Sequence, residues 1–237
     1  MSAPVTILTG AGSGIGHALA LMLAERGHTL HLVGRTANKL AHTESEILAA
    51  NPGAKVRTHC IDLCDSDLAH GVVDSAIATD GGIDCLVNCA GIAPLAPIDR
   101  TDESVLEHAF MTNTFAPAFL IARCWPHFAE RRAGCIVNIS SMASIDPFPG
   151  FFAYAASKAA LDSLTRSCHN EGARRGIRAF CINPGAVETP LLRSNFPERV
   201  LPHAKTLAPE SVARVALDCI EGRRDEDRGR PIPLPSP

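Results

Sequence analysis

The chain is predicted to adopt an α/β fold with a doubly wound parallel sheet of six to seven strands and helices on both faces. Two observations predict it. Short runs rich in Val, Ile and Leu alternate along the chain with longer segments of helical periodicity. Those short runs are apolar at consecutive positions, as is typical of parallel strands buried on both faces.

The elements follow one another regularly from the N-terminus. Apolar runs predict strands at residues 4–9, 29–34, 55–61, 83–88, 134–140 and 177–182. Helical spacing covers residues 15–26, 37–50, 66–79, 102–131 and 153–175, and an amphipathic pattern predicts a last helix within 209–224. Residues 225–237 are expected to form an irregular C-terminal tail, with 231–237 either a short edge strand or loose chain.

Composition bounds the functional classes. The 237 residues, 46% hydrophobic and 20% charged with a net charge of −3, predict one globular domain over 1–237. The absence of a basic surplus argues against a nucleic-acid partner, and no apolar run approaches the ~18 residues of a membrane span. We also expect no signal peptide and no metal site. The nine cysteines lie mostly in strand-like runs, which indicates buried thiols and a cytoplasmic location.

A glycine cluster follows the first predicted strand. Gly10, Gly14 and Gly16 stand in the stretch TGAGSGIG, directly before an Ala- and Leu-rich helical segment. Glycine lets the backbone turn sharply and approach a ligand closely. The free N–H groups and positive dipole end of the following helix suit a pyrophosphate. This context indicates a dinucleotide site on a Rossmann-type sheet.

The end of the second strand indicates which dinucleotide is bound. NAD sites usually carry an acid there for the adenosine ribose, whereas NADP sites carry positive charge for the 2′-phosphate. No acid occurs between Glu25 and Glu44, and Gly34 and Arg35 stand at the expected place. Because a guanidinium suits a phosphate, NADP(H) is the predicted cofactor and NAD(H) the less favoured one.

The chemistry is predicted to reside in an isolated phenol and a neighbouring ammonium. Tyr154 is the only tyrosine in the chain, and Lys158 follows four positions later. On a helix the two lie on one face, one turn apart. An ammonium lowers the pKa of a phenol from about 10, so the phenol can exchange a proton with an alcohol or alkoxide near neutral pH. The competing interpretation is a chance spacing, with Tyr154 as core filler.

Two further polar positions support a site. Ser140 and Ser141 stand where a predicted strand ends, at the edge where open α/β sheets bind ligands. Asn113 lies in an otherwise apolar helical segment, where its amide costs stability unless it is hydrogen-bonded. A hydrogen bond that only packs two helices together would also explain Asn113.

Together these motifs resemble the short-chain dehydrogenase/reductase family, in its compact single-domain branch. The resemblance runs from residue 5 to about 190, with the motifs in the family's order and spacing. They are TGAGSGIG, Asp62-Leu63, NCAG at 88–91, Asn113, Ser141, YAASK at 154–158 and NPGAVETP at 183–190. The chain departs from the family in two places. Cys89 replaces the second asparagine of the usual NNAG, and the usual final strand with its Asp-Gly-Gly-like turn is missing.

The resemblance implies a role for each motif. Tyr154 would be the acid/base, and Lys158 would lower its pKa and bind the nicotinamide ribose. Ser141 would hydrogen-bond the substrate oxygen, and Asn113 would support a water leading from Lys158 to solvent. The implied cofactor-binding residues, from phosphate to nicotinamide, are Gly10, Ser13, Gly14, Ile15, Gly16, Arg35, Asp62, Leu63, Asn88, Ala90, Gly91, Tyr154, Lys158, Pro184, Gly185, Val187 and Thr189. Asp62 would meet the adenine, and residues 88–91 would line the adenosine side.

The segments expected around the substrate are residues 91–97, 142–152 and a lid at 190–208. The first two are nearly all apolar, with Asp146 their only charge, which predicts a neutral or apolar carbonyl or alcohol substrate. The expected reaction is hydride transfer between the nicotinamide and a carbonyl or secondary alcohol. Two alternatives remain: a 3-oxoacyl-thioester reductase, which needs a basic entrance for an acyl carrier, and a non-catalytic dinucleotide-binding regulator. The resemblance also implies a homodimer or homotetramer.

Overall fold

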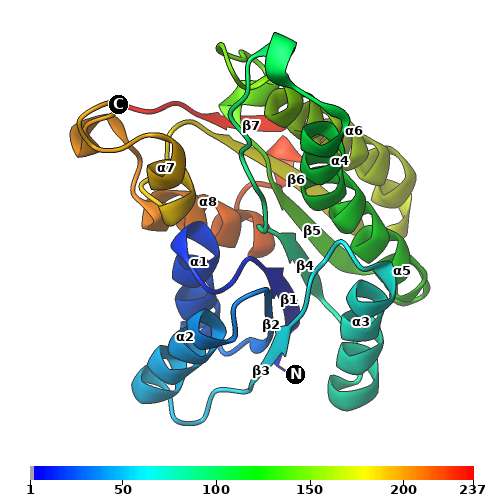
Figure 1. Ribbon diagram of the computed structural model, residues 1–237. Helices are drawn as coiled ribbons and strands as arrows, with labels where there is room; N and C mark the ends of the chain where they lie inside the picture. The colour runs from blue at the N-terminus through cyan, green and yellow to red at the C-terminus, as the bar shows by residue number, and fades with distance from the viewer. Residues whose placement is uncertain (1–2) are drawn as a thin grey trace.

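The computed structural model describes residues 3–237. In this range the chain forms a seven-stranded parallel sheet with the strand order β3-β2-β1-β4-β5-β6-β7 (Figure 1). The strands are β1 (Val5–Thr9), β2 (Thr29–Gly34), β3 (Val56–Cys60), β4 (Cys85–Asn88), β5 (Gly134–Ile139), β6 (Ile177–Pro184) and β7 (Pro231–Leu234). The predicted doubly wound parallel sheet is thereby confirmed.

Helices cover both faces of this sheet. One face carries α1 (Gly14–Glu25), α2 (Ala37–Ala50) and α8 (Pro209–Ile220). The other carries α3 (Ser66–Asp80), α5 (Ala116–Arg131) and α6 (Phe152–Gly172), with α4 (Glu103–Phe110) against α6. The short α7 (Pro190–Asn195) lies in the lid segment and begins at a proline whose preceding residue, Thr189, caps the helix through its hydroxyl.

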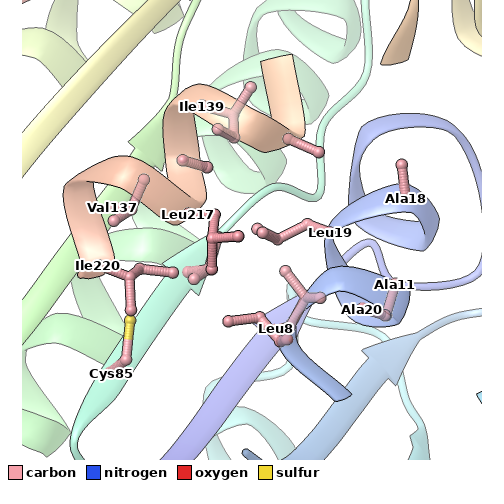
Figure 2. Close-up of a cluster of buried hydrophobic side chains, with 14 of the residues drawn as sticks. Leu8, Ala11, Ala18, Leu19, Ala20, Cys85, Val137, Ile139, Leu217 and Ile220 are labelled. Atoms are coloured by element: carbon pink, nitrogen blue, oxygen red, sulfur yellow. The ribbon is translucent and has the colours of Figure 1, made fainter. Parts of the chain in front are cut away.

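Two apolar clusters, one on each face, hold the layers together. On the first face, Leu8 of β1 meets Leu19 of α1 and Leu217 of α8, all fully buried (Figure 2). On the second, Ile7 of β1 joins Val73 of α3 in an equally buried cluster. Neighbouring residues of β1 therefore point to opposite faces, and both are apolar because both faces are covered.

The order in which successive strands join the sheet reverses between β1 and β4. β1 pairs with β2 on one side and with β4 on the other, so the connections leave the two strands toward opposite faces. In an open α/β sheet this switch point opens a crevice at the carboxyl ends of the strands. Residues 10–16, 88–91, 140–141 and 184–189 all follow strand ends at this edge.

Two segments differ from expectation. The helical stretch 102–131 contains one π-helical turn, Met111–Phe115, between α4 and α5, and this turn includes Asn113. Residues 231–234 are not irregular, because they form β7 beside β6. Burial of Ile232 in the first apolar cluster stabilises this strand, and an edge position tolerates its two prolines.

Within residues 3–237, no helix is both long enough and apolar enough to cross a bilayer.

Candidate active site

A cavity of about 680 Å³ opens at the carboxyl edge of the sheet. Its lining combines the glycine loop after β1, the segment after β4, the serines after β5, the start of α6 and the segment after β6. All three segments expected around the substrate contribute to it as well. Cavities of this size commonly hold small ligands.

The glycine loop leaves the start of α1 open toward this cavity. Gly10 has φ +68°, and a Cβ there would lie 2.8 Å from the backbone nitrogen of Ala90. Ser13 is the N-cap residue of α1 but makes no side-chain cap bond, and no acid stands in the first turn. The first N–H groups of α1 are therefore uncapped beside Gly14 and Ile15, which line the cavity. This cradle fits a pyrophosphate.

A smaller cavity of about 170 Å³ continues from the glycine loop toward β2 and β3. Arg35 and Lys39 line it, together with Asp62 and Leu63. Sequence reasoning identified Arg35, just before α2, but missed Lys39, in the first turn of that helix. Two cations in one small cavity fit a phosphate group.

The tyrosine and lysine lie on the same face of α6 and inside the larger cavity. Tyr154 is 9% exposed and Lys158 is 4% exposed. The Nζ atom of Lys158 donates a 2.8 Å hydrogen bond to the carbonyl oxygen of Ile139, the last residue of β5. An ammonium carries three donors, so two remain for other partners.

The two serines after β5 have separate roles. Ser140 is buried, and its hydroxyl donates to the backbone oxygen of Lys158 at 3.3 Å. The hydroxyl of Ser141 instead accepts a 3.1 Å hydrogen bond from the backbone N–H of Ala143, and Ser141 acts to lower the pKa of the Tyr154 phenol. Ser141, rather than Ser140, is therefore the serine that shares a site with the tyrosine.

Burial shifts the pKa values of both ionisable groups. It raises the pKa of Tyr154 above its usual value, against the opposing effect of Ser141. It lowers the pKa of Lys158 to about 8. The sequence also predicts that Lys158 lowers the pKa of Tyr154, but in the structure this pKa responds to burial and to Ser141. In both cases burial disfavours the charged form of the group, because few water molecules can solvate it.

Asn113 is fully buried, and its side chain is fully engaged. Its Oδ1 accepts a 2.9 Å hydrogen bond from the backbone N–H of Ile92, and its Nδ2 donates to the oxygen of Ile92 and to the hydroxyl of Ser157. A Cβ on Gly91 would lie 3.2 Å from the Asn113 oxygen and 3.4 Å from the Lys158 nitrogen. Asn113 therefore fixes the segment after β4 beside the lysine.

Comparison with known proteins decides the family. The model of the short chain dehydrogenase family matches residues 4–200. The chain belongs to the short-chain dehydrogenase family.

Individual relatives agree with this assignment. An uncharacterized oxidoreductase of Mycobacterium bovis is 32% identical over 92% of this chain, which spans 64% of that protein's length. A 3-oxoacyl-[acyl-carrier-protein] reductase of Thermotoga maritima is 33% identical over 90% of this chain and 88% of its own. The crystal structure of levodione reductase matches the fold with a TM-score of 0.93, covering 99% and 97% of the two chains at 24% identity. Short-chain dehydrogenases are oxidoreductases that use nicotinamide dinucleotides.

Most of the residues that the family motif designates line one of the two cavities. The exceptions are Gly16, Asn88 and Asn113. A Cβ on Gly16 would lie 2.3 Å from the oxygen of Gly10, so this glycine allows α1 to approach the loop. Asn88 is buried, and its Nδ2 donates to Asn138 Oδ1 of the neighbouring strand at 2.8 Å.

Two residues that the short-chain dehydrogenase motifs do not include also line the larger cavity. Pro235 and Ser236, just beyond β7, line the larger cavity. The hydroxyl of Ser236 accepts a 2.7 Å hydrogen bond from the backbone N–H of Ala186. A Cβ on Gly185 would lie 2.4 Å from the same hydroxyl. Nothing local in the sequence indicates this contact, since it depends on the pairing of β7 with β6.

One charged residue of the lid segment, Arg193, is tied into the fold. Arg193 forms an ion pair with Glu188 and donates from Nη1 to the backbone oxygens of Phe196, at 3.1 Å, and Leu201, at 2.7 Å. This guanidinium also lowers the pKa of Glu188 to about 2. Arg193 therefore fixes the course of the lid and is not free to bind a substrate anion.

Proposed function

We propose that this protein is an NADP(H)-dependent oxidoreductase that interconverts a neutral ketone and its secondary alcohol. One observation carries the proposal: Tyr154, Ser141 and Lys158 line the same cavity as the uncapped start of α1. An acid/base group and a pyrophosphate cradle thus face one space. The arrangement suits a carbonyl bound between the tyrosine and a dinucleotide.

The proposed roles follow from the hydrogen bonds of each group. When bound, the nicotinamide supplies or accepts the hydride. Ser141 positions the substrate oxygen beside Tyr154, which donates its proton to that oxygen in reduction and recovers it in oxidation. Lys158, held by its bond to Ile139, keeps a positive charge close to the phenol and has donors left for the ribose. Asn113 acts indirectly, by fixing residue 92 beside this group.

The NADP(H) preference rests on the smaller cavity. Arg35 and Lys39 provide two cations where the 2′-phosphate would lie, and Asp62 would face the adenine. Opposite charges at short range in a partly enclosed site favour a phosphate over a ribose hydroxyl. We therefore propose NADP(H) as the cofactor, with these two residues as the selective ones.

The two alternative functions are less well supported. Reduction of a carrier-bound thioester calls for a basic entrance, and within residues 3–237 the cavity lining itself adds only Asp146 and Lys158 as charged side chains. A regulator without turnover has no need of the complete set of Tyr154, Lys158 and Ser141. We also propose a cytoplasmic homodimer or homotetramer, for which light scattering on the purified protein is the test.

Turnover separates an enzyme from a regulator. We expect loss of reduced-nicotinamide absorbance when NADPH is mixed with the protein and a panel of neutral ketones and diketones. NADH should support a slower reaction. Binding of NADPH without turnover of any ketone, diketone or acyl thioester would favour the regulator.

A further inference from the structure

Aromatic rings form part of the lining of the larger cavity beside Tyr154. Phe151 packs against Tyr154 with ring centroids 4.8 Å apart. Phe148 lies 4.3 Å from Phe151, and Phe196 of the lid lies 6.0 Å from Phe148 and 6.1 Å from Phe151, also between centroids. We call Phe148, Phe151 and Phe196 the aromatic wall. All three line the larger cavity beside the proposed acid.

Backbone geometry holds the first two rings of the wall in place. Gly150 has φ +91°, a conformation that favours glycine, and turns the chain between Phe148 and Phe151. The N–H of Phe151 donates to the oxygen of Phe148 at 3.1 Å, and the N–H of Ala96 donates to the oxygen of Gly150 at 2.9 Å. The turn is therefore tied to the segment after β4.

The lid holds the third ring. Asn195 donates a 2.7 Å hydrogen bond to the oxygen of Ala93, and Arg193 donates to the oxygen of Phe196 itself. Both bonds fix the position of Phe196 relative to the rest of the cavity. Three rings from two separate segments are thus pre-arranged around one space.

The wall is apolar and has an exposed edge. Phe151 is 7% exposed, but Phe148 is 48% exposed at the mouth of the cavity. A ligand that covers Phe148 therefore removes apolar surface from water. Aromatic faces and edges also attract another aromatic ring in tilted or offset arrangements, which a saturated chain does not match.

Charge selects against anionic ligands. Within residues 3–237, Asp146 and Lys158 are the charged side chains that line the cavity, and Lys158 is already bonded to Ile139. Arg193 is paired with Glu188. A carboxylate or phosphate on the far side of the substrate would be desolvated without a cation to compensate it.

We propose that the substrate is an uncharged ketone, or the corresponding alcohol, whose carbonyl stands next to a flat, unsaturated or aromatic ring. This inference rests on the proposed carbonyl chemistry and adds the class of compound. The ring packs against the aromatic wall while its carbonyl oxygen reaches Ser141 and Tyr154.

Matched ketones test the proposal. Acetophenone and 2-octanone have the same number of carbons, but only the first carries a ring. We expect kcat/KM to be about ten-fold higher for acetophenone, and Phe148→Leu or Phe196→Leu to reduce this ratio about three- to ten-fold by removing one aromatic contact. Phe152→Leu is the control, because Phe152 is 46% exposed and lies outside the lining. The anion 4-acetylbenzoate should react about ten-fold less well than acetophenone.

Two results would overturn the proposal: equal kcat/KM for the two neutral ketones, or a ratio that Phe148→Leu and Phe196→Leu leave unchanged. Binding separates this inference from the function on which it rests. Saturation-transfer NMR on the Tyr154→Phe protein should still detect acetophenone more strongly than 2-octanone, with the difference lost in the added Phe148→Leu change. If that binding preference is present but no ketone is reduced, the proposed reaction is wrong and the ring preference stands. If ketones are reduced without any binding preference, the proposed reaction stands and the ring preference is wrong.

Discussion

The Lys158 ammonium donates a 2.8 Å hydrogen bond to the carbonyl oxygen of Ile139 and so ties α6 to the end of β5. This bond fixes the distance between the lysine and the serines that directly follow that strand. The Lys158 ammonium is therefore held in place in the cavity that Tyr154 also lines, although burial lowers the pKa of Lys158 to about 8.

The first prediction concerns the pH dependence of reduction. Below about pH 8 Lys158 carries its proton, and above it the charge is lost. Since kcat/KM reports the ionisation of the free enzyme, we expect it to be level below pH 8 and to fall about ten-fold per unit above that value. Lys158→Arg keeps the charge at all these values and should move the decline to higher pH. An identical profile in Lys158→Arg would show that another group controls the decline.

The second prediction concerns cofactor choice. Removal of either cation of the smaller cavity, by Arg35→Ala or Lys39→Ala, should raise KM for NADPH about ten-fold by removing one charge-assisted phosphate contact. KM for NADH should change less than about two-fold, because NADH lacks the 2′-phosphate. Lys55→Ala is the matched control, since Lys55 is exposed and lies outside this cavity. Equal effects on both cofactors would contradict the assignment of the phosphate to this cavity.

The third prediction concerns the contact beyond β7. Ser236→Ala removes the acceptor of the Ala186 N–H, and this loss should destabilise the folded chain by about 1 kcal/mol, or ~2–4 °C in Tm. Because residues 184–187 line the cavity, KM for NADPH should also rise several-fold. Ser211→Ala, at an exposed position on α8, should change neither quantity. A lower Tm with an unaltered KM would limit Ser236 to a structural role.

How far the sequence alone could predict this molecule depends on the range of each interaction. The sheet, the glycine loop and the Tyr154–Lys158 pair follow from local periodicity and from a spacing of four residues. Ser236 escaped prediction because its partner lies 50 residues away and meets it only through strand pairing. The motifs identified most residues that line the two cavities, but not the cavity volumes or the contributions of Lys39, Pro235 and Ser236.

Tertiary packing decides two further points that the local sequence does not. Asn88 ends a strand whose four residues are all buried, so its amide bonds to the neighbouring strand instead of facing the cavity. For residues 231–237 the sequence left a short edge strand and loose chain both open, and burial of Ile232 favours the strand at 231–234 despite its two prolines.

The central claim is that Tyr154 transfers the proton during carbonyl reduction, and Tyr154→Phe tests it most directly because the ring and its packing against Phe151 are kept. One measurement is kcat/KM for reduction of a ketone that the wild type accepts, monitored by the loss of NADPH absorbance. The other is the Kd for NADPH, from fluorescence titration. We predict a fall in kcat/KM of about 10²- to 10⁴-fold with a Kd within about two-fold of the wild type. A variant that binds NADPH equally well and retains most of its kcat/KM would contradict the claim.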